Sequence, residues 1–213
     1  MRKTILLTSS IDPNGCSFLT RGSIEDRKND YLLAVEKWLT GTSFDIVYVD
    51  NSGYDLGFII DRFSENSSRI EFLSYDGNGY DRALGKGYGE LEIINYALTN
   101  SSKISSCDHL IKSTGRYFFP KMESFLDGVR LEDYDFVGLF NEGVVHTGFF
   151  AVDKSFYLDF IGGVGGNPVN DTAGYYIEHL FYNMAFSTER RLLIDTLGAE
   201  GISGTFGTDI NWM

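Results

Sequence analysis

Short apolar runs alternate with amphipathic stretches along the first part of the chain. Residues 3–7 form an apolar run before a polar loop and read as a first strand. Residues 44–49 are apolar on both faces, which is typical of a parallel strand covered on both sides. Between them, residues 31–39 repeat apolar side chains at three- and four-residue spacing. Ser23 followed by Asp26 resembles an N-terminal capping box, so we predict a helix that begins near Ser23.

The alternation continues to residue 119. Residues 56–63 have a helical pattern, and residues 70–74 form an apolar run that ends in a glycine-rich turn at 76–79. A second glycine-rich turn, Gly85-Lys86-Gly87-Tyr88-Gly89, leads into a helical pattern at 90–98, and a strand-like run at 109–119 follows. Strand, glycine loop, helix and strand form the βαβ unit of α/β domains.

The second half of the chain has a mixed pattern. Residues 136–140 and 147–152 read as strands joined by a turn at Gly143, and residues 172–186 as a helix. We expect a short helix or loop at 122–131, a loop at 158–170, and a partly mobile tail at 198–213. This order of strands and helices predicts one α/β domain over residues 1–213, with a mostly parallel, Rossmann-like central sheet flanked by helices.

Composition narrows the class of ligand. The formal net charge of −12 argues against a nucleic-acid-binding protein, so an anionic ligand would need a local cationic pocket. No apolar run reaches the roughly 20 residues that span a bilayer. Cys16 and Cys107 suggest neither a disulfide framework nor a zinc site, which fits a reducing cytoplasm.

Candidate anion-binding residues follow from the predicted strand at 109–119. Because side chains alternate with period two, Lys112, Thr114 and Arg116 are expected on one face. Lys86, in the glycine turn, could add a charge, and the amides at the start of the next helix could approach a phosphate. The structural alternatives are a surface arginine capping a strand end, a lysine reaching the sheet edge, and a turn that only needs positive φ angles.

A polar turn follows the predicted second strand. Asp50, Asn51 and Asp55 could bind a ribose or a base, because ligands of open α/β sheets bind at the carboxyl ends of the strands. The alternative is a hydrogen-bonded turn without a ligand.

Glu178 is the leading candidate for a general base. It lies in the predicted helix at 172–186 among aromatic residues, and burial there would raise its pKa toward the range useful to a base. Asp153 and Asp171 are the other candidate bases. The alternative for Glu178 is an ordinary solvated residue on a helix face.

The order of these motifs resembles a GT-A-type nucleotide-sugar glycosyltransferase. Residues 44–55, FDIVYVDNSGYD, resemble the strand and acidic, serine-containing turn that recognise the nucleotide. Residues 85–90 and the helix after them resemble the glycine-rich turn and helix before the central strand. Residues 108–116 resemble the strand that leads to the Asp-x-Asp motif, and residues 178–181 resemble the segment with the acceptor-activating carboxylate. The resemblance covers most of residues 3–186.

The resemblance implies a division of labour. Residues 1–120 would bind the nucleotide sugar and residues 121–213 the acceptor, with Glu178 taking the acceptor proton and Arg116 stabilising the leaving group. The other donor-binding residues that it implies are Thr8, Ser9, Asp50, Asn51, Asp55, Lys86, Gly87, Lys112 and Thr114.

One departure from the family pattern changes the expected chemistry. Thr114-Gly115-Arg116 stands where Asp-x-Asp, whose carboxylates hold a divalent cation, would be. A guanidinium offers a fixed fork of donors to phosphate oxygens. We therefore predict transfer without an essential metal or other cofactor, and no metal-ligating residues.

The implied function is transfer of a sugar from a nucleotide sugar to a glycan or glycolipid acceptor in bacterial surface polysaccharide or lipooligosaccharide assembly. Such an enzyme would be cytoplasmic, with peripheral association at the inner face of the cytoplasmic membrane. The missing Asp-x-Asp keeps a noncatalytic nucleotide- or glycan-binding module as an alternative. A sugar nucleotidyltransferase is disfavoured, because Ser9-Ser10-Ile11-Asp12 is not a glycine-rich, basic phosphate loop. The sequence leaves open the base, the sugar, the acceptor, the stereochemical outcome and the oligomeric state.

Overall fold

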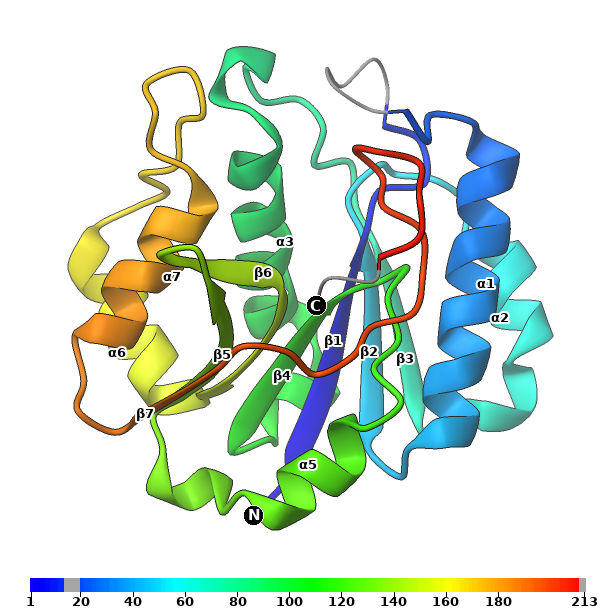
Figure 1. The fold of residues 1–213 in the computed structure, drawn as a ribbon. Coiled ribbons are helices and arrows are strands. Elements are labelled where there is room, and N and C mark those ends of the chain that lie inside the picture. Colours follow the sequence, from blue (N-terminus) through cyan, green and yellow to red (C-terminus); the bar gives the residue numbers. More distant parts are fainter. Residues whose placement is uncertain (14–19, 211–213) are drawn as a thin grey trace.

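A seven-stranded sheet forms the centre of the molecule (Figure 1). The structure is a computed structural model that describes residues 1–13 and 20–210. The strand order is β3-β2-β1-β4-β6-β5-β7. The strands are β1 (Lys3–Ser9), β2 (Asp45–Asp50), β3 (Ile70–Ser74), β4 (His109–Thr114), β5 (Phe136–Asn141), β6 (Val144–Asp153) and β7 (Arg191–Ile194). Strand β6 is antiparallel to both of its neighbours, whereas the other pairings are parallel, so the predicted mostly parallel α/β sheet is confirmed.

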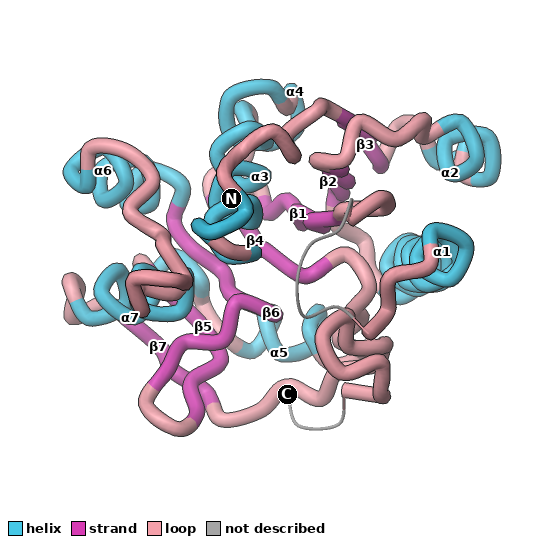
Figure 2. Tube along the Cα trace, turned by 90° about the horizontal axis from the view of Figure 1, so that it is seen from above, coloured by secondary structure: helices cyan, strands magenta, loops and turns pink. Residues whose placement is uncertain are grey.

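Helices cover both faces of the sheet (Figure 2). They are α1 (Ile24–Gly41), α2 (Gly57–Arg62), α3 (Lys86–Asn100), α4 (Ser102–Ser105), α5 (Met122–Gly128), α6 (Lys154–Val164) and α7 (Ile177–Phe186). The apolar faces of α1, α2 and α5 pack into one core cluster, and those of α3, α4, α6 and α7 into a second cluster on the other side of the sheet. Burial on both faces explains why the parallel strands are continuously apolar.

The predicted helix near Ser23 is confirmed. The Ser23 side chain accepts a hydrogen bond from the Asp26 amide at the start of α1. The buried stripe of α1 contains Tyr31, Val35 and Trp38, at the spacing that the sequence shows. It also contains the charged residue Arg27, which lies one turn before Tyr31 and is buried with it.

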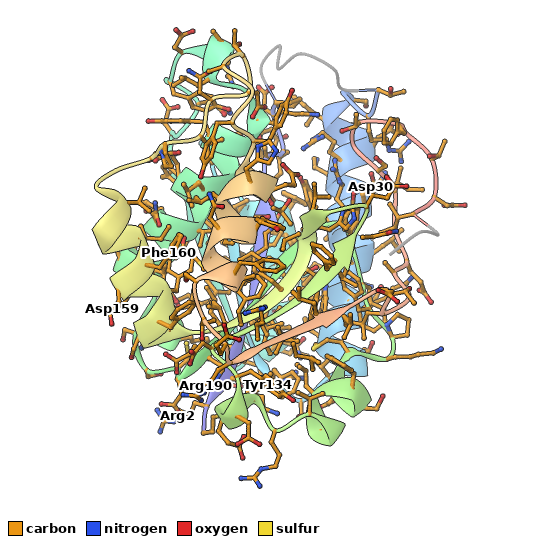
Figure 3. All side chains as sticks on the ribbon, turned by 60° about the vertical axis from the view of Figure 1, so that its left-hand side comes forward. Arg2, Asp30, Tyr134, Asp159, Phe160 and Arg190 are labelled. Atoms are coloured by element: carbon orange, nitrogen blue, oxygen red, sulfur yellow. The ribbon has the colours of Figure 1, made fainter. Side chains whose placement is uncertain are left out.

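Two of the predictions for the second half of the chain are wrong. The expected loop at 158–170 is helical as far as Val164, because Asp153 caps the start of α6 and the glycines fall only in its last turn and beyond. The helix expected from residue 172 begins at Ile177 instead. Figure 3 shows Asp159 and Phe160 on α6, at the outer edge of the molecule.

Strand β4 ends earlier than the apolar pattern suggests. The Gly115 amide donates to the Thr8 carbonyl at 2.8 Å, and a Cβ on Gly115 would lie 2.7 Å from that oxygen. The chain therefore turns immediately after Thr114. Lys112 and Thr114 belong to the strand, but Arg116 lies beyond its end, so the expectation of one shared strand face holds only for the first two.

The segment 198–210 returns across the carboxyl ends of the strands (Figure 1). Isolated antiparallel β-bridges join Glu200 to Phe118 and Ile202 to Asp209. The Gly204 carbonyl accepts hydrogen bonds from the amides of Thr20 and Arg21. Residues 14–19 and 211–213, which include Cys16, lie outside the described residues. Within the described ranges, no helix is long and apolar enough to cross a membrane.

Candidate functional site

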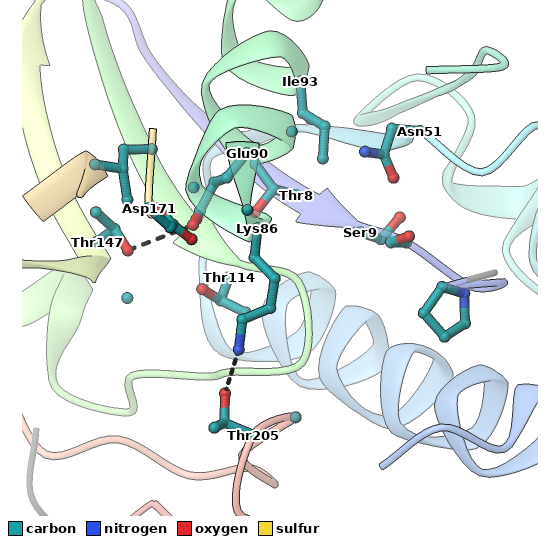
Figure 4. A pocket seen from close by; sticks show the side chains of 18 of the residues that line it. Thr8, Ser9, Asn51, Lys86, Glu90, Ile93, Thr114, Thr147, Asp171 and Thr205 are labelled. Carbon is teal, nitrogen blue, oxygen red and sulfur yellow. Dashed lines mark hydrogen bonds between the residues drawn. The ribbon is translucent and has the colours of Figure 1, made fainter. Parts of the chain in front are cut away.

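A cleft of about 1020 Å³ opens at the carboxyl ends of β1, β2 and β4. The N-terminal turns of α3 and α7 form one side of it, and α1 with the segment 203–206 forms the other. Nine residues predicted from the sequence line the cleft: Thr8, Ser9, Asn51, Lys86, Gly87, Thr114, Arg116, Asp171 and Glu178. Figure 4 shows Ser9 and Asn51 on one side of Lys86, and Thr147 with Asp171 on the other.

Asp50 does not line the cleft but holds together the loops beside it. Its buried carboxylate accepts hydrogen bonds from the Ser9 hydroxyl at 2.9 Å, the Ile11 amide at 2.7 Å and the Ser52 amide at 2.8 Å. It therefore joins the loop after β1 to the turn after β2. Asp55 is exposed and caps Gly57 at the start of α2, so the structure does not bring it to the cleft.

Asn51 remains available to a ligand. Its side chain is 3% exposed and lines the cleft, and among the described residues its Oδ1 has no hydrogen-bond partner. A buried unpartnered acceptor is unfavourable, so this atom is suited to accept a hydrogen bond from a bound molecule.

The amides at the start of α3 have a partner within the protein. The Asp171 carboxylate accepts hydrogen bonds from the backbone amides of Lys86 and Gly87. Burial raises the pKa of Asp171, and these hydrogen bonds oppose the rise. Gly85, at φ +87°, is required here, because a Cβ would lie 2.0 Å from Asp171 Oδ2. The amides that we expected to approach a phosphate are thus already capped.

Lys112 is also satisfied internally. Its side chain is fully buried, and Nζ donates to the Glu90 carboxylate and to the Thr147 carbonyl. Glu90 comes from α3 and Thr147 from β6, so the lysine joins a helix to two strands. The structure does not bring Lys112 to the cleft, and its charge is compensated by Glu90.

Arg116 is placed very differently. It is 9% exposed and lines the cleft, yet its Nε and Nη1 atoms have no hydrogen-bond partner in the described part of the chain. Gly204 lies directly over the guanidinium, since a Cβ there would lie 2.3 Å from Nη2. Nearby, Lys86 Nζ donates to Thr205 Oγ1 at 3.0 Å (Figure 4). The returning segment 203–206 therefore covers both cations.

Glu178 lies in the first turn of α7, on the side of the cleft that also contains Glu90 and Asp171, which we call the carboxylate side. Burial raises the pKa of Glu178, and the negative charges of Glu90 and Asp171 raise it further, against an opposing effect of Lys112. Such a carboxyl group is suited to proton transfer. Asp153, the third candidate base, caps α6 through the Phe156 amide and does not line the cleft.

Two cleft arginines were not predicted from the sequence. Arg27 is 4% exposed and donates to the carbonyls of Ser10 and Arg21. Arg82 lies 5.2 Å from the centroid of the Tyr80 ring. The position of Arg27 on the stripe of α1 that includes Tyr31 is a sequence signal that could have identified it. In the described ranges, none of the cleft cations forms an ion pair; these cations are Arg27, Arg82, Lys86 and Arg116.

Comparisons with known proteins identify the fold. No protein-family model matches the chain, and no curated protein sequence matches it. A solved structure described as a nucleotide-diphospho-sugar transferase from Desulfovibrio desulfuricans G20 aligns over 91% of this chain and 80% of its own, with a TM-score of 0.51 and 14% identity. The chain has a GT-A-like fold.

Other structures with this fold contain ligands. The galactosyltransferase LgtC in complex with donor and acceptor sugar analogs aligns over 89% of this chain and 72% of its own, with a TM-score of 0.50 and 12% identity. S. aureus TarS in complex with UDP-GlcNAc aligns over 92% of this chain and 56% of its own, with the same TM-score and 12% identity. At these identities the likeness concerns the fold alone.

The GT-A-like fold raises the question of a metal. Thr114-Gly115-Arg116 contains no carboxylate, and no three His, Cys, Asp or Glu side chains within residues 1–13 and 20–210 are placed to hold a metal ion. These residues do not fit the divalent cation that the Asp-x-Asp motif would hold. Transfer without a metal remains a prediction.

Proposed function

We propose that this protein is a glycosyltransferase that moves a sugar from a nucleotide-sugar donor to an acceptor hydroxyl, without an essential divalent metal. The observation that carries the proposal is Arg116, a buried cation in a cleft at the carboxyl ends of parallel strands. Its Nε and Nη1 atoms have no hydrogen-bond partner among the described residues. Burying an uncompensated charge is costly, and a bound anion would offset that cost.

The anion is the departing diphosphate. Breaking the bond between the anomeric carbon and the phosphate oxygen leaves the electron pair, and thus growing negative charge, on the diphosphate. A fixed guanidinium stabilises this charge without reorganising, which is often the largest catalytic effect. Lys86, 3.0 Å from Thr205, can turn toward the same anion. Ser9 and Asn51 would hold the nucleoside at the other end.

Glu178 would receive the acceptor proton if the reaction inverts configuration. The acceptor oxygen then bonds to the anomeric carbon as its proton passes to the carboxylate. The raised pKa of Glu178 makes the carboxylate a stronger base, provided that it is ionised at the working pH. A reaction that retains configuration would need no base at this position.

The proposed acceptor and cellular location rest on the resemblance of the sequence motifs to GT-A-type glycosyltransferases. We propose a glycan or glycolipid acceptor in bacterial surface glycan assembly, with the protein in the cytoplasm or at the inner face of its membrane. Support for the two-substrate scheme comes from LgtC, solved with donor and acceptor sugar analogs, and from TarS, solved with UDP-GlcNAc.

The test has two steps on the purified full chain. Thermal unfolding in the presence of nucleotides and nucleotide sugars should identify a stabilising ligand, since ligands of the native state raise its stability. Nucleoside diphosphate release from the corresponding nucleotide sugar is then measured. Release above the level of an Arg116→Ala control supports the transferase. Binding without release would favour the noncatalytic module, and pyrophosphate release from a nucleoside triphosphate would favour the nucleotidyltransferase.

A further inference from the structure

Two arginines are buried beside one tyrosine at the wall of the cleft. Arg27 on α1 is 4% exposed and Arg116 after β4 is 9% exposed. Each guanidinium carbon lies 5.8 Å from the centroid of the Tyr31 ring, so the two cations lie within twice that distance of each other. Both line the same cleft.

The hydrogen bonds of Arg27 leave its charge uncompensated. Nε donates to the Ser10 carbonyl at 2.7 Å, Nη1 to the Arg21 carbonyl at 3.0 Å, and Nη2 to the Tyr31 hydroxyl at 3.0 Å. All three acceptors are neutral. A guanidinium has five N–H groups, so two remain for a ligand.

Neither arginine forms an ion pair with a carboxylate among the described residues. Asp30 is engaged by Arg21, whose Nε and Nη2 donate to its two oxygens at 3.0 and 2.9 Å. Two like charges in a poorly solvated wall repel each other more strongly than in water. One ligand with two linked negative groups would compensate both, whereas a single phosphate would leave one of them with little compensation.

We propose that Arg27 and Arg116 form a two-arginine diphosphate site, in which Tyr31 is a positioning residue for both guanidinium groups. This inference rests on the proposed function and adds Arg27 as a second residue that binds the diphosphate assigned above to Arg116. Arg116 lines the cleft, and its Nε and Nη1 atoms have no partner among the described residues. Arg27 supplies the second charge and contacts the segment after β1 through the Ser10 carbonyl.

The test uses inorganic pyrophosphate and inorganic phosphate as probes of the full chain, by calorimetry in excess EDTA. Pyrophosphate should bind more tightly than phosphate. Arg27→Gln should weaken pyrophosphate binding by about 10- to 100-fold, the usual effect of losing a hydrogen bond to a charged group. Its effect on phosphate should be several-fold smaller. The same contrast is expected between nucleoside diphosphates and monophosphates.

Three variants separate this role from scaffolding. Lys28→Gln makes the same charge change on the next residue of α1, which pairs with Glu25 at 3.0 Å, and should leave pyrophosphate binding unchanged. Arg27→Lys keeps the charge without the planar fork and should be intermediate. Tyr31→Phe keeps the ring and removes its hydroxyl, and should weaken pyrophosphate binding less than Arg27→Gln. Urea unfolding without ligand shows which variants are folded.

Two results would overturn the two-arginine site. One is wild-type protein that binds pyrophosphate no better than phosphate. The other is a folded Arg27→Gln variant that weakens both anions equally, because a distorted loop would do so. If nucleoside diphosphate release from a nucleotide sugar were unaffected by Arg27→Gln, the transferase would stand without this site. Arg27-dependent pyrophosphate binding with no such release would keep the site and remove the transferase.

Discussion

The two sides of the cleft handle charge in opposite ways. On the carboxylate side, Glu90 forms an ion pair with Lys112, and the Asp171 carboxylate accepts hydrogen bonds from the amides at the start of α3. On the cationic side, Arg27 and Arg116 have no carboxylate partner in the described part of the chain. The carboxylate side is therefore largely compensated by the fold itself. The cationic side is where the fold leaves charge for a ligand to compensate.

Lys112 and Arg116 show the same contrast four residues apart. Both were expected to contact a diphosphate. Lys112 points to the face covered by α3, where Glu90 compensates it, whereas Arg116 lies past the end of β4 and opens to the cleft. Equal cationic character in the sequence thus becomes a structural role for one residue and a candidate ligand-binding role for the other.

The largest expected effect is on stability, from Lys112→Met. Removing one member of a buried ion pair leaves the other uncompensated, which should lower the free energy of unfolding by about 3 to 5 kcal/mol. Urea denaturation measures this loss. Adding Glu90→Gln should recover part of it, because the uncompensated carboxylate is then gone. A Lys112→Met variant of wild-type stability with impaired diphosphate binding would instead return Lys112 to the ligand.

Arg116→Ala should act on turnover. We expect a loss of about 100- to 1000-fold in nucleoside diphosphate release, as for removal of one donor to a developing charge. Stability should change little, because the Nε and Nη1 atoms of Arg116 have no hydrogen-bond partner among the described residues that the substitution would remove. Arg130→Ala removes an exposed arginine far from the cleft and is the matched control. Parallel losses of melting temperature and turnover in Arg116→Ala would make this residue structural.

Glu178→Gln should lower turnover by about 100-fold if the reaction inverts. The wild-type rate should fall as pH drops through the raised pKa of Glu178, because a protonated group cannot accept the proton. Glu189→Gln, at an exposed glutamate, is the control. Undiminished turnover in Glu178→Gln would exclude it as the base.

Glu178→Gln should also change how the stability of the protein depends on pH. Because the pKa of Glu178 is raised on folding, the native state binds its proton more tightly than the unfolded chain. The stability that this provides is complete below the ordinary pKa of 4.5 and is lost as pH rises through the raised value. Gln resembles the protonated form. Glu178→Gln should therefore be more stable than wild type at pH 8, and the difference should shrink at pH 4.

Asp171→Ala should give the smallest effect. Losing the carboxylate that caps α3 should cost about 1 kcal/mol of stability, as for other N-terminal caps. The freed amides of Lys86 and Gly87 should then bind an anion more readily, which pyrophosphate calorimetry can measure. Unchanged stability and unchanged anion affinity would show that this cap is unimportant.

Strands β1 and β2 could be predicted because burial on both faces makes them almost continuously apolar. Helix α1 could be predicted because only one face of it is buried, which gives it a clear apolar stripe. Helix α6 was missed because Gly162 and Gly163 suggest a loop, yet they lie in its last turn, where the cost of glycine is small. The α7 boundary was misplaced because the aromatic residues at 175–176 continue the helical spacing.

The candidate site was readable only in part. Polar residues at strand ends, such as Ser9 and Asn51, follow from topology, since parallel strands end at one edge of the sheet. The pairing of Lys112 with Glu90 depends on how α3 crosses β4, which no local pattern specifies. Arg27 was not predicted, although its spacing from Tyr31 places it on the buried stripe of α1, where it donates a hydrogen bond to the Ser10 carbonyl.

The central claim is that an arginine takes the place of a metal in stabilising the leaving diphosphate. The most direct test measures nucleoside diphosphate release from the preferred nucleotide sugar in excess EDTA, and again with added Mn²⁺ or Mg²⁺. We predict full activity in EDTA and no need for either ion. Activity that EDTA abolishes and Mn²⁺ or Mg²⁺ restores would contradict the claim.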